Sequence, residues 1–343
     1  MVEDRALDEL QDFTSWLSEN RADGFIGEVG WPRDTGDADQ WNHLAERWMQ
    51  HADASGLWVT AWATGEWWPQ DYRLAIYTAS DSSGLDTVHS QAVVLERHLA
   101  HPGRGVNVAG AEFAAPSVAP KSAFSNRNAG TYGVDYHYDS QETFDFLARR
   151  GVGMVRIPFR WERLQPRLGR PLSKLELQRL ADAVQRAGTA GLEVVLDMHN
   201  YGAYYKDRNG HGIRRAIGTT RCTTADFADV WRRLSRRFDD NRTVIGYGLM
   251  NEPIGIPPTD RATPARRWER ISQRVLNTIR ARHDVTTILV PGYEWSGVQS
   301  WRQNHPDGWI TDPANQFRYE AHHYWDRDHS GTYVLSYDEE NTP

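Results

Sequence analysis

The feature of this sequence that most restricts its fold is a regular alternation of short apolar runs with amphipathic stretches. The apolar runs have the length of strands and cover residues 24–30, 56–62, 104–110, 151–159, 191–199, 244–250, 285–292 and 317–324. Helix-like periodicity occupies the intervals, at residues 3–20, 38–54, 86–100, 139–150, 173–190, 224–240, 264–283 and, more weakly, 297–304. Strands separated by helices pair in parallel, and eight such repeats predict a closed (β/α)8 TIM barrel of the α/β class.

The whole chain, residues 1–343, is predicted to form one domain. Its length is ordinary for a barrel with loop insertions, and neither an internal repeat nor a low-complexity tract or linker interrupts the pattern. One helix start is marked clearly, because Ser173 is followed three residues later by Glu176 in the pattern of a capping box.

Charge and cysteine content exclude several classes of partner. The formal net charge is −7, and no block of basic residues is present, so we expect neither nucleic acid nor a membrane surface as a partner. Cys222 is the one cysteine, so an internal disulfide is excluded. No apolar run has membrane-spanning length, and the charged start MVEDRALDELQDF is unlike a signal peptide. We expect a monomer and leave the localisation open.

Tryptophan is frequent, with 15 residues, and many of them follow predicted strands. Flat aromatic faces suit the apolar faces of sugar rings, so we favour sugar binding over core packing for this group. The strand-end tryptophans are Trp31, Trp62, Trp67, Trp68, Trp161, Trp295 and Trp325. By contrast, Trp48, Trp231 and Trp268 lie on predicted helical faces and are expected in the core.

Two glutamates end apolar runs: Glu28 in GFIGEVGWP and Glu252 in VIGYGLMNEP. Active sites of such barrels lie at the carboxyl ends of the strands. Glycoside hydrolysis needs one carboxyl group to protonate the leaving oxygen and a second to stabilise or trap the sugar cation. Either glutamate alone could instead be a capping or salt-bridge residue.

Six motifs together resemble glycoside hydrolase family 5, the cellulase family. RIPFRWERLQP resembles the family's strand 2, LDMHNYG strand 3, GLMNEP strand 4, YEAHHYWDRDHSG strand 6, FIGEVGWP strand 7 and AWATGEWW strand 8. The resemblance implies that Glu252 is the acid/base and Glu28 the nucleophile, with no cofactor. It also implies contacts with substrate or nucleophile for Arg156, His199, Asn200, Asn251, His322, Tyr324 and Trp62. Trp31, Trp67, Trp68 and Trp295 are added as candidate sugar-binding residues.

The order of these motifs differs from the family's order. Strands 7 and 8 come first, within residues 1–100 together with helices 6–8, and strands 1–6 follow within residues 101–343. This arrangement predicts a circular permutation, with both chain ends near one another on the catalytic face and strand 1 paired with strand 8. A misassembled or truncated tandem gene would give the same fold.

The function that this resemblance implies is retaining hydrolysis of a β-linked glucan, and most specifically an endo-acting β-1,4-glucanase. The two carboxyl groups should then be roughly 5–5.5 Å apart. An exo-acting or mannan- or disaccharide-directed β-glycosidase is the alternative, because GEWWPQDYRLAIY departs from the cellulase pattern. A catalytically inactive carbohydrate-binding barrel is disfavoured by the presence of both glutamates. The family resemblance also makes secretion plausible.

No metal is expected from the sequence. The run from Asp326 imitates a calcium loop, but Tyr337 stands where that loop needs a bidentate acid. Zinc ligation by His199, His211, His322 and His323 is rejected because no pair has the usual helical spacing. Glu66, Glu112 and Glu294 also lie near strand ends and are interpreted as structural or peripheral.

Overall fold

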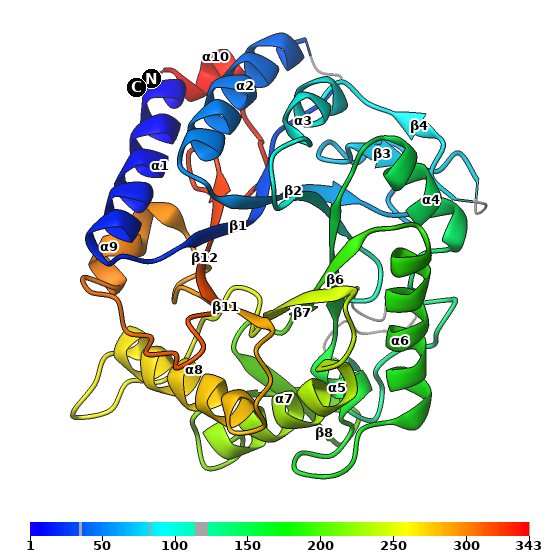
Figure 1. Ribbon diagram of the computed structural model, residues 1–343, viewed down its shortest axis with the longest axis vertical. Coiled ribbons are helices and arrows are strands. Elements are labelled where there is room, and N and C mark those ends of the chain that lie inside the picture. Colours follow the sequence, from blue (N-terminus) through cyan, green and yellow to red (C-terminus); the bar gives the residue numbers. More distant parts are fainter. Residues whose placement is uncertain (34–35, 82–83, 114–122, 343) are drawn as a thin grey trace.

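Eight parallel strands close into a barrel in the computed structural model, which describes residues 1–33, 36–81, 84–113 and 123–342 (Figure 1). The barrel strands are β1 (Gly24–Gly30), β2 (Trp58–Thr64), β5 (Arg104–Val108), β6 (Met154–Phe159), β7 (Glu193–Met198), β10 (Val244–Gly248), β11 (Thr287–Pro291) and β12 (Phe317–Tyr324). Successive strands pair with one another, and β12 returns to pair with β1, which closes the sheet. The predicted barrel is therefore confirmed.

Helices cover the outside of the barrel (Figure 1). The long ones are α1 (Val2–Glu19), α2 (Ala38–Ala54), α3 (Ala92–His98), α4 (Gln141–Arg149), α6 (Lys174–Thr189), α7 (Thr224–Phe238) and α8 (Pro264–Arg280). Short helical segments are α5 (Trp161–Leu164), η2 (Val298–Ser300), α9 (Trp301–Asn304) and α10 (Tyr337–Glu340). Each long helix buries one apolar face; in α8, for example, Trp268, Leu276 and Ile279 are fully buried.

Local residue chemistry explains where the helices begin. Thr263 caps α8, and Pro264 occupies its first turn, where a missing N–H is harmless. Ser173 caps α6 by accepting a hydrogen bond from the backbone of Glu176, as expected. The Glu176 carboxylate does not return to the cap; instead it accepts hydrogen bonds from Tyr136 and Tyr138, at 2.7 and 3.1 Å.

Two expectations about local structure were wrong or incomplete. The helix expected at 86–100 begins only at Ala92, because Thr87 and Val88 form β4 (Thr87–Val88) antiparallel to β3 (Tyr77–Thr78). A hairpin of β8 (Ala203–Arg208) and β9 (His211–Ala216) was not anticipated. Its turn is Asn209-Gly210, and both residues have positive φ angles. This dipeptide is a strong sequence signal for a hairpin.

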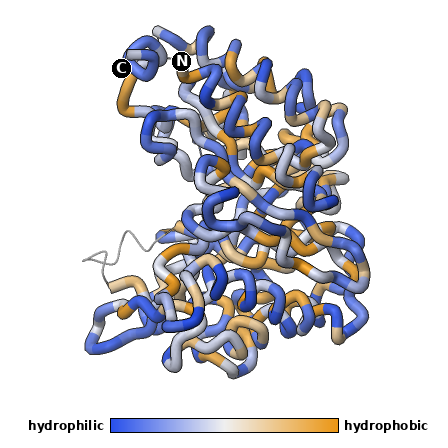
Figure 2. Tube along the Cα trace, turned by 90° about the vertical axis from the view of Figure 1, so that its left-hand side faces the viewer, coloured by the Kyte–Doolittle hydropathy of each residue, from blue (hydrophilic) through white to orange (hydrophobic). Residues whose placement is uncertain are grey.

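Both ends of the chain lie side by side (Figures 1 and 2). The backbone N–H of Val2 donates to Asn341 at 2.8 Å, and Arg5 donates to the carbonyl of Trp325, just after β12, at 2.6 Å. The ends are therefore at the carboxyl side of the barrel strands, as predicted. β2 and β5, the segments expected to correspond to strands 8 and 1 of the family, pair in parallel.

Within the described ranges, no helix combines the length and apolar character needed to cross a membrane.

Candidate active site

Glu28 enters the barrel mouth from a bulge in β1. The pairing of β1 with β12 shifts register between Ile26 and Glu28, and bulges of this kind re-aim a side chain. The carbonyl of Gly27 is held there by Thr60 and Asn107, at 2.6 and 2.8 Å. A side chain at Gly27 is excluded, because a Cβ atom would lie 2.3 Å from the Glu320 carboxylate.

Arg156, fully buried on β6, is the centre of the charge network under Glu28. Its Nη1 donates to Glu28 Oε1 at 3.2 Å, and its Nη2 lies 3.1 Å from both Asp197 and Glu320. Burial lowers the pKa of Arg156, but the charges of Asp197, Glu320 and Glu28 outweigh it and hold that pKa above its ordinary value. Tyr324 donates to the other Glu28 oxygen at 2.7 Å. Glu28 therefore accepts a hydrogen bond at each of its two carboxyl oxygens.

Glu252 differs from Glu28 in its surroundings. Its side chain is 16% exposed and its backbone has a left-handed φ of 44°, an uncommon conformation that is frequent at functional sites. Burial raises the pKa of the Glu252 carboxyl group, a hydrogen bond with His322 opposes this, and the charge of Glu28 adds to the increase. The net effect is a raised pKa, which favours the protonated acid.

His322 lies between the two glutamates. Its Nδ1 is 2.9 Å from Glu252 Oε1 and 3.5 Å from Glu28 Oε2. Burial lowers its pKa, but the charge of Glu28 and the hydrogen bonds with Glu252 and Glu320 raise the pKa of His322 to about 10. At neutral pH this side chain is therefore an imidazolium that lies between the two carboxyl groups. One oxygen of each glutamate and a ring nitrogen of His322 all lie within 4.8 Å of one another.

A second histidine orients Asn251. Burial holds the pKa of His199 well below its ordinary value, so the ring is neutral, and its Nδ1 lies 2.8 Å from Asp197. With Nδ1 as the donor to that carboxylate, Nε2 accepts from the Asn251 amide at 3.2 Å. The Asn251 carbonyl oxygen in turn accepts from Arg156 at 2.7 Å. Both ends of the amide are thus fixed beside Glu252.

A pocket of about 180 Å³ opens above these groups. It is lined by Glu28, Trp62, Tyr72, Leu74, His199, Tyr201, Glu252, Tyr324, Ser330 and Gly331. A larger hollow of about 530 Å³ lies at the opposite barrel end, where Asp23 precedes β1, and it contains neither glutamate. The pocket at the carboxyl ends is therefore the candidate active site.

Aromatic rings continue across this pocket in contact with one another. The Trp62 ring centroid lies 6.2 Å from Trp68 on one side and 6.0 Å from His199 on the other. His199 then contacts Tyr201, at 5.2 Å, and Tyr201 contacts Trp295, at 6.0 Å. Trp295 is 50% exposed and accessible. Trp67, half-buried, lies beyond this series and stacks on His137 with centroids 4.0 Å apart.

Several residues expected at the site lie elsewhere. Trp31, Trp161 and Trp325 are buried in the core, and Trp31 stacks on Trp325 at 5.6 Å, so the sugar-binding interpretation of these three was wrong. Asn200 is also fully buried; it accepts from the backbone of Trp161 and donates to Glu162, at 2.8 and 2.9 Å. This amide holds α5 in place and does not line the pocket. The core positions expected for Trp48, Trp231 and Trp268 are confirmed.

Site residues overlooked in the sequence include Asp197, Tyr201, Glu320 and Tyr72. Asp197 and Glu320 each precede a predicted site histidine by two residues on the same strand, so alternation places them on the same face. This two-residue spacing was the sequence signal that could have identified Asp197 and Glu320. Tyr72 offered none, since it reaches Trp62 from an irregular loop, where its hydroxyl accepts from the indole at 2.8 Å.

The remaining acids near strand ends have identifiable partners. Glu112 accepts from the backbone of Gly110 at 2.7 Å, and burial raises its pKa to about 7. Glu294 is exposed and accepts from Asn304. The Asp326 carboxylate accepts from the backbone N–H groups of residues 331–333, so the loop that imitates a calcium site closes on itself.

Comparison with known proteins agrees with this arrangement. Residues 106–342 match the family described as Cellulase (glycosyl hydrolase family 5). The chain belongs to this family. It is 32% identical over 236 residues to the manganese dependent endoglucanase Eg5A of Phanerodontia chrysosporium, covering 67% of this chain and 54% of that protein. The chain spans about half the length of the curated relatives it matches.

Solved structures give the same picture. The cellobiose complex of endoglucanase Cel5A from Pseudomonas stutzeri is 33% identical with a TM-score of 0.56, over 67% of this chain and 62% of that one. XacCel5A in complex with cellopentaose is 34% identical with a TM-score of 0.55, over 68% of each chain. The pocket with Glu28 and Glu252 is therefore set in a barrel shared with glucan-binding relatives.

Proposed function

We propose that this protein is a retaining endo-β-1,4-glucanase in which Glu28 is the nucleophile and Glu252 the acid/base. The observation that carries the proposal is that one pocket holds two glutamates with different hydrogen-bond partners, and that an oxygen of one lies within 4.8 Å of an oxygen of the other. That separation is compatible with the short spacing of the two carboxyl groups in retaining enzymes.

The charge environment supports these roles. Glu28 accepts hydrogen bonds from Arg156 and Tyr324 and keeps a charged oxygen available for attack on the anomeric carbon. Glu252, whose pKa is raised, gives its proton to the departing glycosidic oxygen. When Glu28 becomes an ester its negative charge disappears, so the pKa of Glu252 falls. The same carboxylate then accepts a proton from the water that hydrolyses the ester.

Uncharged side chains position the substrate. Asn251 binds the 2-hydroxyl of the reacting sugar, because its amide is held beside Glu252 by Arg156 and His199. Trp62 is the platform under that sugar. The ring contacts run from Trp68 through the pocket to the exposed Trp295. An aromatic surface that extends beyond the pocket suits a polymer and favours endo action, and named relatives bind cellobiose and cellopentaose.

The glutamate roles are tested by azide rescue of alanine variants. Glu252→Ala should still form the glycosyl-enzyme from an aryl cellobioside, because a good leaving group needs little protonation. Azide should then restore turnover and yield the β-glycosyl azide, whereas Glu28→Ala should yield the α-glycosyl azide. The opposite pair of product configurations, read by NMR, would reverse the assignment.

The substrate is tested on a panel of carboxymethylcellulose, β-mannan and aryl glycosides. Endo action predicts that the viscosity of carboxymethylcellulose falls much faster than reducing ends accumulate. Faster hydrolysis of mannan, or release of single sugars without a fall in viscosity, would instead support the mannan-directed or exo-acting alternative.

The chain is further proposed to carry the family's barrel in a circularly permuted order, with strands 7 and 8 as β1 and β2 and helix 6 as α1. The match to the family begins at residue 106, close to the start of β5, and Glu28 lies before it. The adjacency of Val2 and Asn341 supports this order, as does the pairing of β2 with β5.

A further inference from the structure

A buried cluster outside the proposed catalytic pair joins two loops at the carboxyl end of the barrel. Glu66 follows β2, while His137 and Asp139 precede α4. The three side chains are 8%, 7% and 1% exposed, respectively. Glu66 is about 70 residues from the other two in the sequence, so its approach to them results from the pairing of β2 with β5.

The donor atoms of this cluster converge. His137 Nε2 lies 2.5 Å from Asp139 Oδ1 and 3.7 Å from Glu66 Oε2. One ligand-type atom from each residue lies within 4.8 Å of the other two. Two carboxylates and one imidazole are thus directed at a common point.

Several polar atoms of this cluster have no hydrogen bond within the protein. Among the residues that the structure describes, both ring nitrogens of His137 and Oδ2 of Asp139 have no hydrogen-bond partner. Polar atoms buried in this way are costly unless a ligand, ion or water meets them. Burial raises the pKa of Asp139, and the neighbouring His137 only partly opposes this increase.

The second carboxylate is already oriented. Glu66 Oε1 accepts from the backbone and hydroxyl of Ser140, at 2.8 and 2.5 Å, and from Thr143 at 2.6 Å. Its other oxygen is thereby turned toward His137. Among the described arginines and lysines, none forms an ion pair with Glu66 or Asp139, so His137 is the one cationic candidate facing them.

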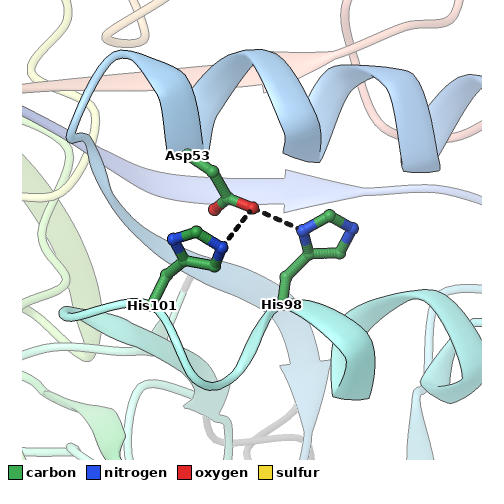
Figure 3. A group of neighbouring side chains, drawn as sticks. All are labelled: Asp53, His98 and His101. Atoms are coloured by element: carbon green, nitrogen blue, oxygen red, sulfur yellow. Dashed lines mark hydrogen bonds and ion pairs between the residues drawn. The ribbon is translucent and has the colours of Figure 1, made fainter.

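A second group, Asp53, His98 and His101, provides an instructive contrast (Figure 3). Both imidazoles point at Asp53 Oδ2, at 2.5 Å from His98 and 3.2 Å from His101. The other Asp53 oxygen, however, is paired with the buried guanidinium of Arg104. Because Arg104 already supplies positive charge there, an added cation would be repelled, and we assign no ligand to that group.

We propose that Glu66, His137 and Asp139 form a binding site for a single divalent transition-metal cation such as Zn²⁺ or Mn²⁺. Two carboxylate oxygens and one imidazole nitrogen suit these ions, while the imidazole disfavours Mg²⁺ and Ca²⁺. The cation neutralises the two acids and binds His137 Nε2, the ring nitrogen that faces them. Deprotonated ligands are required, so binding weakens as the pH falls.

The position of this site gives it a consequence for the pocket. The His137 ring stacks on Trp67, with centroids 4.0 Å apart and planes 29° apart. A bound cation fixes this imidazole and ties the loop after β2 to the start of α4. Trp67, one of the tryptophans expected to meet sugar, is then held in a single orientation.

The experiment measures metal binding by the full chain after treatment with EDTA and buffer exchange, without any substrate. Calorimetric titration with Zn²⁺ and, separately, Mn²⁺ should give one site, and saturating metal should raise Tm by a few degrees. His137→Gln and Asp139→Asn should each weaken binding at least tenfold and abolish the Tm shift. His101→Gln, in the other histidine cluster, is the control and should bind like the wild type.

Each other outcome rejects the proposal. If the wild-type chain shows neither one-site binding nor a Tm shift with either ion, the cluster is an ordinary ion pair of a protonated His137. If His101→Gln loses binding while the His137 and Asp139 variants keep it, the metal occupies the Asp53 group instead. Near-UV circular dichroism checks that each variant is folded. Since binding is measured without turnover, a negative result here leaves the proposed glucanase activity unaffected.

Discussion

The two regions of the chain, residues 1–100 and residues 104–343, supply different numbers of barrel strands. Each supplies one glutamate of the proposed catalytic pair. The first region supplies two barrel strands and Glu28, and the second supplies six strands and Glu252. The family model matches only the second region, so Glu28 lies outside the match. Among the described residues, however, the ionic and tyrosine partners of Glu28 all come from the second region: Arg156, His322 and Tyr324. The difference teaches that the proposed site forms only when the barrel closes, because Glu28 of the first region then meets Arg156 and Tyr324 of the second.

The largest expected effect compares the two glutamates across this division. Glu28→Gln should lower kcat at least about a thousandfold on cellulose and on a dinitrophenyl cellobioside alike, because no ester forms. Glu252→Gln should lose roughly 10²–10⁴-fold on cellulose but keep a rapid first burst with the activated substrate. Stopped-flow release of dinitrophenol measures this. Glu294→Gln, exposed on a loop, is the control; equal bursts in both glutamine variants of the pair would contradict the roles.

The next effect tests the buried charge contact between Arg156 of the second region and Glu28 of the first. Arg156→Met leaves Glu28, Asp197 and Glu320 buried without their cation, which should cost about 3–5 kcal/mol of unfolding free energy. Arg302 also joins the two regions, through Asp12 and Glu19, but at the surface. Arg302→Met should therefore cost less than about 1 kcal/mol in urea unfolding. Similar losses of unfolding free energy in both variants would show that the burial of Arg156 is unimportant for stability.

A smaller effect concerns pH. If Glu252 is the acid, kcat/KM is lost as the pH rises through its pKa. The His322 imidazolium lowers that pKa, so His322→Gln should raise it and move the alkaline limb of the pH profile upward by about one unit. His323→Gln is the matched control, because that ring contacts Trp48 and Glu9 on the outside of the barrel. If the alkaline limb of the profile moves to lower pH in His322→Gln, the role assigned to His322 is wrong.

The smallest effect is expected from reordering the two regions. Joining residue 343 to residue 1 by a short Gly/Ser linker, and opening the chain at the exposed Pro102, would restore the family's strand order. Since Val2 and Asn341 already touch, Tm should change by only a few degrees and kcat by about twofold or less. Calorimetry and a cellulose assay measure both. A reordered chain that cannot fold would argue against the permutation.

Much of the fold could be predicted because its signals are local. Short apolar runs identify the barrel strands and helical periodicity identifies the helices between them, and β1 and β12 have the expected bounds. The hairpin at Asn209-Gly210 was also signalled locally and was overlooked. The proposed roles of Glu28 and Glu252 remain predictions that rest on motif position.

Side-chain accessibility was the property that only the tertiary structure decided. Trp31 and Trp62 both follow strands, yet Trp31 is covered by Trp325 from the far end of the chain, while Trp62 lines the pocket. Asn200 turns toward Glu162, and Glu66 meets His137, for the same reason. The sequence by itself determined which segments are strands and helices and which carboxylates end them. Which of those side chains face one another depended on barrel closure, because burial is set by neighbours that are distant in the chain.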